Sequence, residues 1–112
     1  MNIQEIAQRA TYTIYEREPE LFERYGEKGK EKCLEDNHHH LKQLATSVEL
    51  GNSKMFVDYA VWLNGILLRH GMSTRHLIDN FLILQQLFST DSKEADEYGH
   101  YLELAIHALQ SE

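Results

Sequence analysis

Residues 30–50, KEKCLEDNHHHLKQLATSVEL, give the clearest structural signal in this chain of 112 residues. Four apolar side chains and one asparagine recur there at steps of three and four residues, which places them on one face of an α-helix. The members of this face are Leu34, Asn37, Leu41, Leu44 and Val48. Gly51 follows, and glycine readily takes the left-handed conformation that ends a helix. The stretch therefore predicts a helix with one buried face.

The same spacing recurs on both sides of this stretch. It predicts further helices over residues 2–17, 54–70, 74–88 and 93–110, and a short helix near residues 19–25 that ends at Gly26. The residues suited to helix starts are Pro19, Asn52 or Ser53, Ser73, and Asp91 or Ser92. Long helices with short connections predict an all-α fold, an up-down four-helix bundle with the short helix added. We expect a single helical-bundle domain over residues 1–112, which is an ordinary domain length.

The charge balance argues against several classes of function. The formal net charge is −7, and such a surface repels a phosphate backbone, so we expect no nucleic-acid partner. No apolar run approaches the ~18 residues of a membrane span, and the N-terminus has no apolar signal core. We therefore expect no membrane partner and a cytoplasmic location. The one cysteine, Cys33, allows no internal disulfide, and we interpret it as a small buried apolar side chain.

Seven histidines raise the question of a metal site. Two Glu-x-x-His sequences, from Glu35 to His38 and from Glu97 to His100, have a spacing found in di-iron helical bundles. The apolar pattern of each helix, however, aims most of these side chains at water rather than at a core. We therefore expect no metal and no cofactor. The sequence also has no nucleophile constellation and no phosphate-binding loop, so we expect no enzymatic activity.

Asn37 is a polar residue within an otherwise apolar helix face. A buried amide needs a hydrogen-bond partner, and the polar or aromatic neighbours that can supply one are Asp36, His40, Tyr59 and Trp62. One interpretation is a polar network that fixes how the helices pack. The other is a small-ligand or metal-binding pocket that these five residues form together.

Residues 54–70 and 74–88 have more apolar side chains than one buried face requires. Val57, Val61 and Leu68 on the first helix, and Ile83 and Leu87 on the second, point away from the main apolar face. A second chain can cover such a surface. We therefore expect a homodimer in which these five residues form the interface. The alternative is that the N-terminal helices cover this surface within one chain.

The stretch from Phe22 to Leu84 resembles a small all-helical domain of bacterial sensory and signalling proteins. The likeness rests on the residues FERYG at 22–26, Cys33, Asp36, His40-Leu41, Leu44-Ala45, MFVDY at 55–59, Trp62-Leu63, Leu67 and His70-Gly71. The resemblance implies a domain that occurs alone or beside cobalamin-binding and output domains, with no established activity. It also implies that Asp36, His40, Tyr59 and Trp62 form its polar and aromatic signature.

We accordingly predict a non-enzymatic helical module for regulation or protein interaction. It would self-associate through residues 54–88 and act with a signalling partner protein. The hypothesis from another class is a ligand- or metal-binding sensor with its pocket around Asp36, Asn37, His40, Tyr59 and Trp62. A weaker third hypothesis is pH sensing, because protonation of all seven histidines would cancel the formal charge of −7.

Overall fold

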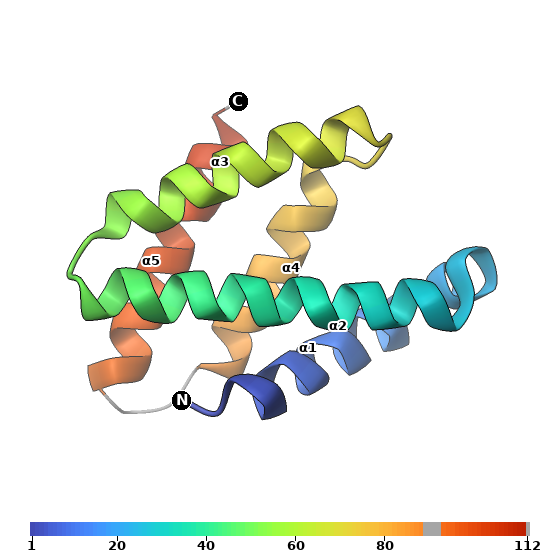
Figure 1. Cartoon of the computed structure of the whole chain (residues 1–112), viewed down its shortest axis with the longest axis horizontal. Helices are drawn as coiled ribbons and strands as arrows, with labels where there is room; N and C mark the ends of the chain where they lie inside the picture. The colour runs from blue at the N-terminus through green and yellow to red at the C-terminus, as the bar shows by residue number, and fades with distance from the viewer. Residues whose placement is uncertain (89–92, 112) are drawn as a thin grey trace. The chain divides into compact units, whose positions relative to one another are not determined.

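The structure, a computed structural model, describes residues 1–88 and 93–111, and the regular structure in these residues is entirely α-helical (Figure 1). The helices are α1 (Ile3–Arg17), α2 (Glu20–Glu49), α3 (Ser53–Arg69), α4 (Thr74–Leu87) and α5 (Lys93–Gln110). The prediction of an all-α chain is therefore confirmed. The predicted start of the last helix, at Asp91 or Ser92, lies outside the described residues.

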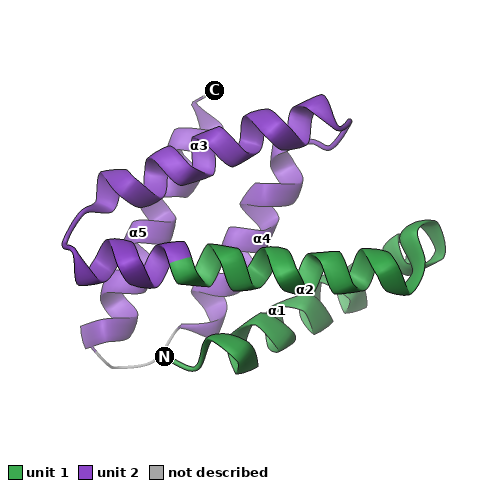
Figure 2. Cartoon of the chain, viewed as in Figure 1, with its two compact units in different colours: residues 1–42 green, residues 43–112 purple. Residues whose placement is uncertain are grey.

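The chain divides into two compact units, residues 1–42 and residues 43–112 (Figure 2). The first unit holds α1 and most of α2, and the second holds the end of α2 together with α3, α4 and α5. The expectation of a single domain stays a prediction. In the described part of the chain, no helix combines the length and the apolarity needed to cross a membrane.

The first helix, α1, buries small side chains. Its start is fixed by Asn2, whose Oδ1 accepts a hydrogen bond of 3.0 Å from the backbone N–H of Glu5. Its buried residues are Ala7, Ala10 and Thr11. The Thr11 hydroxyl donates to the Ala7 carbonyl oxygen at 2.8 Å, so this buried polar group is satisfied within the helix.

A break at Gly26 divides α2 into a short helix and a long one. The φ of Gly26 is 66°, in a region that glycine enters without strain, and residues 20–25 therefore form the predicted short helix. The long helix resumes at once rather than near residue 30, because Gly29 stays helical. A Cβ at Gly29 would collide with the Cβ of Tyr25. The close approach of Tyr25 thus explains why a glycine stands inside the helix.

The buried face of α2 follows the predicted spacing but is broader. Asn37, Leu41 and Leu44 have no exposed surface, as the periodicity predicts, whereas Leu34 and Val48 at the two ends of the face are half-buried. His40 and Ser47 are also buried, and the Ser47 hydroxyl donates to a backbone carbonyl one turn earlier. The extra buried positions lie beside the predicted face and make it wide enough to include polar side chains.

Within residues 43–112, α5 packs against both α3 and α4. The largest side chains without exposed surface in this unit include Phe56, Phe81, Leu84 and Leu102, and the Phe56 and Phe81 rings lie 5.5 Å apart between α3 and α4. In Figure 1, α3 crosses over α4 and α5 instead of running along them. The up-down four-helix bundle is therefore not confirmed, because that architecture needs helices aligned along a common axis.

The ends of α3 and α4 agree with the sequence. The Asn52 side chain accepts a hydrogen bond of 3.2 Å from the backbone N–H of Met55 at the start of α3. Ser73 precedes α4, and its own backbone N–H donates to His76 Nδ1 at 3.3 Å. Gly71, with a φ of 81°, follows α3 as predicted.

Candidate functional site

Three of the five residues predicted to line a pocket lie on α2, within residues 1–42. Asn37 and His40 are buried, whereas the Asp36 side chain is 38% exposed and pairs with Lys32 at 2.9 Å. The Asn37 Nδ2 donates to the carbonyl oxygen of Cys33 at 3.0 Å. Asn37 and His40 therefore belong to the interior, and Asp36 belongs to the surface.

The Cys33 thiol lies against polar side chains of α1 and α2. The Asn37 Nδ2 is 3.7 Å from the Cys33 Sγ, and the Thr11 side chain on α1 also hydrogen-bonds the thiol. Burial raises the pKa of the thiol, and burial together with Cys33 raises the pKa of the Tyr15 hydroxyl on α1. Cys33 as a whole residue is nevertheless only half-buried.

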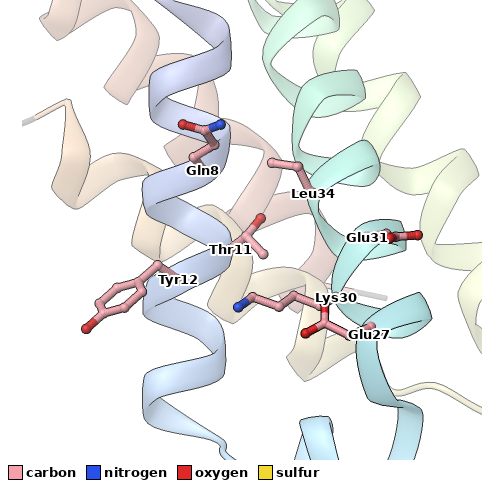
Figure 3. Close-up of a pocket in the computed structure, with 7 residues that line it drawn as sticks. All are labelled: Gln8, Thr11, Tyr12, Glu27, Lys30, Glu31 and Leu34. Carbon is pink, nitrogen blue, oxygen red and sulfur yellow. The ribbon is translucent and has the colours of Figure 1, made fainter.

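A groove of about 360 Å³ lies between α1 and α2 in the same unit (Figure 3). Lys30 extends from α2 toward α1, and Thr11 and Leu34 lie on the two sides of the groove, while Tyr12 and Glu31 point away from it. The groove thus offers the Lys30 ammonium, the Glu27 carboxylate, the Gln8 amide, the Thr11 hydroxyl and the aliphatic side chain of Leu34. The residues that line it are Gln8, Thr11, Tyr12, Glu27, Lys30, Glu31 and Leu34.

The other two predicted pocket residues, Tyr59 and Trp62, lie on α3 in residues 43–112. Their ring centroids are 6.3 Å apart, and Trp62 is 62% exposed. The prediction that these rings share a pocket with Asp36, Asn37 and His40 stays a prediction.

The residues predicted to form a dimer interface divide into three groups. Val61 and Leu68 are exposed, and Val57 and Leu87 are half-buried. Ile83 requires a correction, because it is only 3% exposed. It is one of four side chains that α4 buries, since α4 packs against two helices and its buried face is broader than a single row. Ile83 therefore adds nothing to an exposed surface.

The histidines form no metal centre in residues 1–88 and 93–111, where no three His, Cys, Asp or Glu side chains gather to hold an ion. His107 lies 3.0 Å from the Glu103 carboxylate one turn away. Gln85 on α4 also donates to Glu103, at 2.8 Å, and this hydrogen bond together with His107 lowers the pKa of the Glu103 carboxyl. This cluster links α4 to α5 and is a packing feature.

Sequence reasoning did not predict the groove between α1 and α2, and it did not include Cys33 among the candidate site residues. The available signal was the pair Cys33 and Asp36, which lie three residues apart and so share one side of a helix. The groove residues gave no such signal, because Thr11 and Leu34 come from helices far apart in the sequence.

A family model described as "Phycobilisome protein" matches residues 1–109 of the chain. No curated protein and no solved structure matches it. The family match overturns two predictions. The resemblance to a bacterial sensory and signalling domain is wrong, and so is the prediction of a regulatory or protein-interaction module with a signalling partner. The resemblance rested on apolar spacing, which unrelated helical families share.

Proposed function

This chain belongs to the phycobilisome protein family, and we propose that it is a light-harvesting protein that binds a bilin, a linear tetrapyrrole pigment. The proposal replaces the regulatory module with the ligand-binding alternative that the sequence offered. Members of this family are pigment proteins and not enzymes. The observation that supports pigment binding in this chain is the half-buried thiol of Cys33 with a carboxylate three residues further along the same helix.

Cys33 is the residue proposed to hold the pigment. Its thiol would hold the pigment through a thioether linkage to a substituent of the tetrapyrrole. The chain has one cysteine, so only one such linkage per chain is available. The bound pigment would supply the absorption of visible light.

Asp36 is the residue proposed to bind the pyrrole N–H groups of the pigment. A carboxylate accepts several hydrogen bonds, and the Asp36 side chain is accessible at 38% exposure. Its present partner, Lys32, is itself largely exposed, and surface ion pairs of this kind are weak enough to exchange partners. Asn37 acts as a positioning residue, since its amide holds both the backbone and the sulfur of Cys33. His40, one turn beyond Asn37 on α2, is also buried in this unit.

The groove between α1 and α2 is the space proposed for part of the pigment. Its volume of about 360 Å³ lies near the lower end of the range of small-molecule pockets, about 300–1,000 Å³. Leu34 offers apolar surface to a conjugated ring, and the Lys30 ammonium can pair with a pigment carboxylate. Thr11 belongs to both the groove and the surroundings of the thiol, which connects the two parts of the site.

The test is to produce the chain in cells that make a bilin and to measure visible absorption before and after denaturation. The wild type is expected to keep its colour on a denaturing gel, because the linkage is covalent. Cys33→Ser is expected to lose that colour. Asp36→Asn is expected to keep the linkage but to shift the absorption band of the native protein, because the charge next to the pyrrole nitrogens is gone.

The matched control is Asp58→Asn, which removes an exposed carboxylate from α3 and is expected to leave the spectrum unchanged. Helical circular dichroism of each variant shows that it has folded. A wild-type chain that folds but stays colourless, or a Cys33→Ser variant with undiminished covalent pigment, would contradict the proposal.

Phycobilisome proteins assemble into oligomers with other proteins of the family, and the partners proposed here are such proteins. Phycobilisomes lie on the cytoplasm-facing surface of the thylakoid membrane. That surface is the proposed location of this chain.

A further inference from the structure

Gly65 stands in the middle of α3, where packing within the chain does not require a glycine. Glycine in a helix interior is less stable than alanine. A Cβ at Gly65 would have one near neighbour among the described residues, Arg69 Nη2 at 3.9 Å. That atom ends a flexible, exposed side chain. The backbone of the same helix and the two adjacent residues are left out of this comparison. The small residue is therefore unexplained by the contacts of the described chain.

Gly65 is half-buried and lies in a row of otherwise exposed residues on α3. Asp58, Trp62, Gly65 and Arg69 follow one another at steps of four, three and four residues, so they share one side of the helix. We name these four residues the α3 stripe. The Asp58 side chain and Trp62 are each 62% exposed. Asp58 pairs with the exposed Lys54 at 2.8 Å, a surface ion pair that can exchange partners. Two exposed apolar side chains flank the stripe, Val61 and Leu68.

The steps of four, three and four residues in the α3 stripe read the same from either end. The stripe begins with a negative residue, Asp58, and ends with a positive one, Arg69. When two copies of α3 pack antiparallel about a two-fold axis between residues 63 and 64, Asp58 faces Arg69 of the second copy, and Trp62 faces Gly65 of the second copy. We propose that this chain self-associates through the α3 stripe in this antiparallel arrangement.

Charge and size both select this partner. The formal net charge of −7 makes two copies repel each other, so their contact needs local pairs of opposite charge, and the two-fold axis supplies two Asp58–Arg69 pairs. Parallel packing would instead place Asp58 beside Asp58. Gly65 leaves room for the indole of the second copy, and the Arg69 guanidinium beside Gly65 can stack on that indole.

A contact through one helix is small. It buries less than about 1,200 Å², which is typical of weak association. The dimer is therefore expected only at high protein concentration, on the order of 100 µM. The inference does not depend on pigment binding, so it is tested on pigment-free protein and can succeed or fail separately from the proposed function.

The decisive experiment exchanges the charges of the α3 stripe and measures self-association by sedimentation velocity. Asp58→Arg alone and Arg69→Asp alone are each expected to weaken the dimer by about tenfold or more, because like charges then face each other. The double variant Asp58→Arg/Arg69→Asp is expected to recover the dimer. An equimolar mixture of the two single variants is expected to form a mixed dimer, since both of its charge pairs are again opposite.

A second variant separates folding from association. Gly65→Gln is expected to abolish the dimer while raising the melting temperature of the monomer, because glutamine is the better helix former. The matched control is Gly99→Gln on α5, where a Cβ also has open space, and it is expected to leave the dimer intact. A wild type that stays monomeric, or single charge variants that dimerise as well as the wild type, would overturn the inference. So would a stripe that binds a different family member and not a second copy.

Discussion

His40 is a histidine that the fold holds in its neutral form. Burial lowers its pKa from 6.5 to about 3, and the neighbouring His39 adds to this effect. Between these two pH values, the unfolded chain binds a proton at this position that the folded chain does not. The contribution to stability is therefore complete above pH 6.5 and is lost progressively as the pH falls toward 3.

We predict that the free energy of unfolding, measured by urea titration, decreases below pH 6.5. The part due to His40 has a slope that approaches about 1.4 kcal/mol per pH unit. His40→Gln is expected to flatten this dependence, because it removes the titrating group. His100→Gln, at an exposed position on α5, serves as the control and is expected to keep the slope. An unchanged slope in His40→Gln would place the pH dependence elsewhere.

Two buried asparagines differ in how well their polar atoms are satisfied. Asn64 on α3 is 1% exposed, and its Oδ1 has no hydrogen-bond partner among the described residues. Asn37 is equally buried but donates to the Cys33 carbonyl oxygen. We predict that Asn64→Leu raises the free energy of unfolding by about 1–2 kcal/mol, because it removes an unsatisfied buried acceptor. Asn37→Leu is expected to lower it. Thermal melts followed by circular dichroism compare the two, and equal destabilisation would refute the distinction.

These residues show what a sequence pattern can and cannot identify. Asn37 was predictable as a buried polar group, because it interrupts a clean apolar row. Asn64 was not, because α3 has apolar residues on several sides and its buried face is not unique. Cys33 is half-buried, and its contact with Thr11 was not predictable, because Thr11 comes from another helix.

Among the helices, the break in α2 depends on one backbone conformation. Gly26 has a φ of 66°, and a residue with a Cβ is strained there. We predict that Gly26→Ala lowers the free energy of unfolding by about 1–2 kcal/mol. Gly99→Ala, in the middle of α5 with open space around its Cβ position, is expected to raise it by about 0.5–1 kcal/mol. Chemical denaturation of both variants measures the difference, and stabilisation by Gly26→Ala would disprove the strain.

Helix ends were more predictable than helix packing. Gly51, Gly71 and Asn52 mark ends that the structure confirms, because positive φ and side-chain capping are local properties of the chain. The prediction of an up-down bundle, by contrast, was not confirmed. The way α3 crosses α4 and α5 depends on side chains that meet from different helices, and a period of three and four residues contains no information about that angle.

Considered as a whole, the chain has unequal cores in its two units. The buried side chains of α1 are Ala7, Ala10 and Thr11, whereas α5 buries larger residues that include Tyr98 and Leu102. Small side chains remove less apolar surface from water, so local opening costs less free energy. We predict that amides in residues 3–17 exchange hydrogen at least about tenfold faster than those in residues 98–109. Exchange followed by mass spectrometry on the full chain tests this, and equal rates would contradict it.

The main prediction of function from the sequence pattern was wrong. Apolar periodicity and an absence of catalytic residues favoured a regulatory module, and they did so because such features are common to many helical proteins. The match over residues 1–109 corrected the family. Of the two residues proposed to hold the pigment, Asp36 was among the predicted pocket residues, whereas Cys33 was interpreted only as a small buried side chain.

The aromatic rings of α3 and α4 have an optical consequence. The centroids of Phe81 and Phe56 lie 5.5 Å apart, those of Phe56 and Tyr59 5.8 Å apart, and those of Tyr59 and Trp62 6.3 Å apart. Tryptophan has the lowest excitation energy of the three ring types, so ultraviolet light absorbed along this row is emitted from Trp62, the only tryptophan of the chain. Because Trp62 is largely exposed, the tryptophan fluorescence of the protein reports on whatever touches that one ring, with no added label.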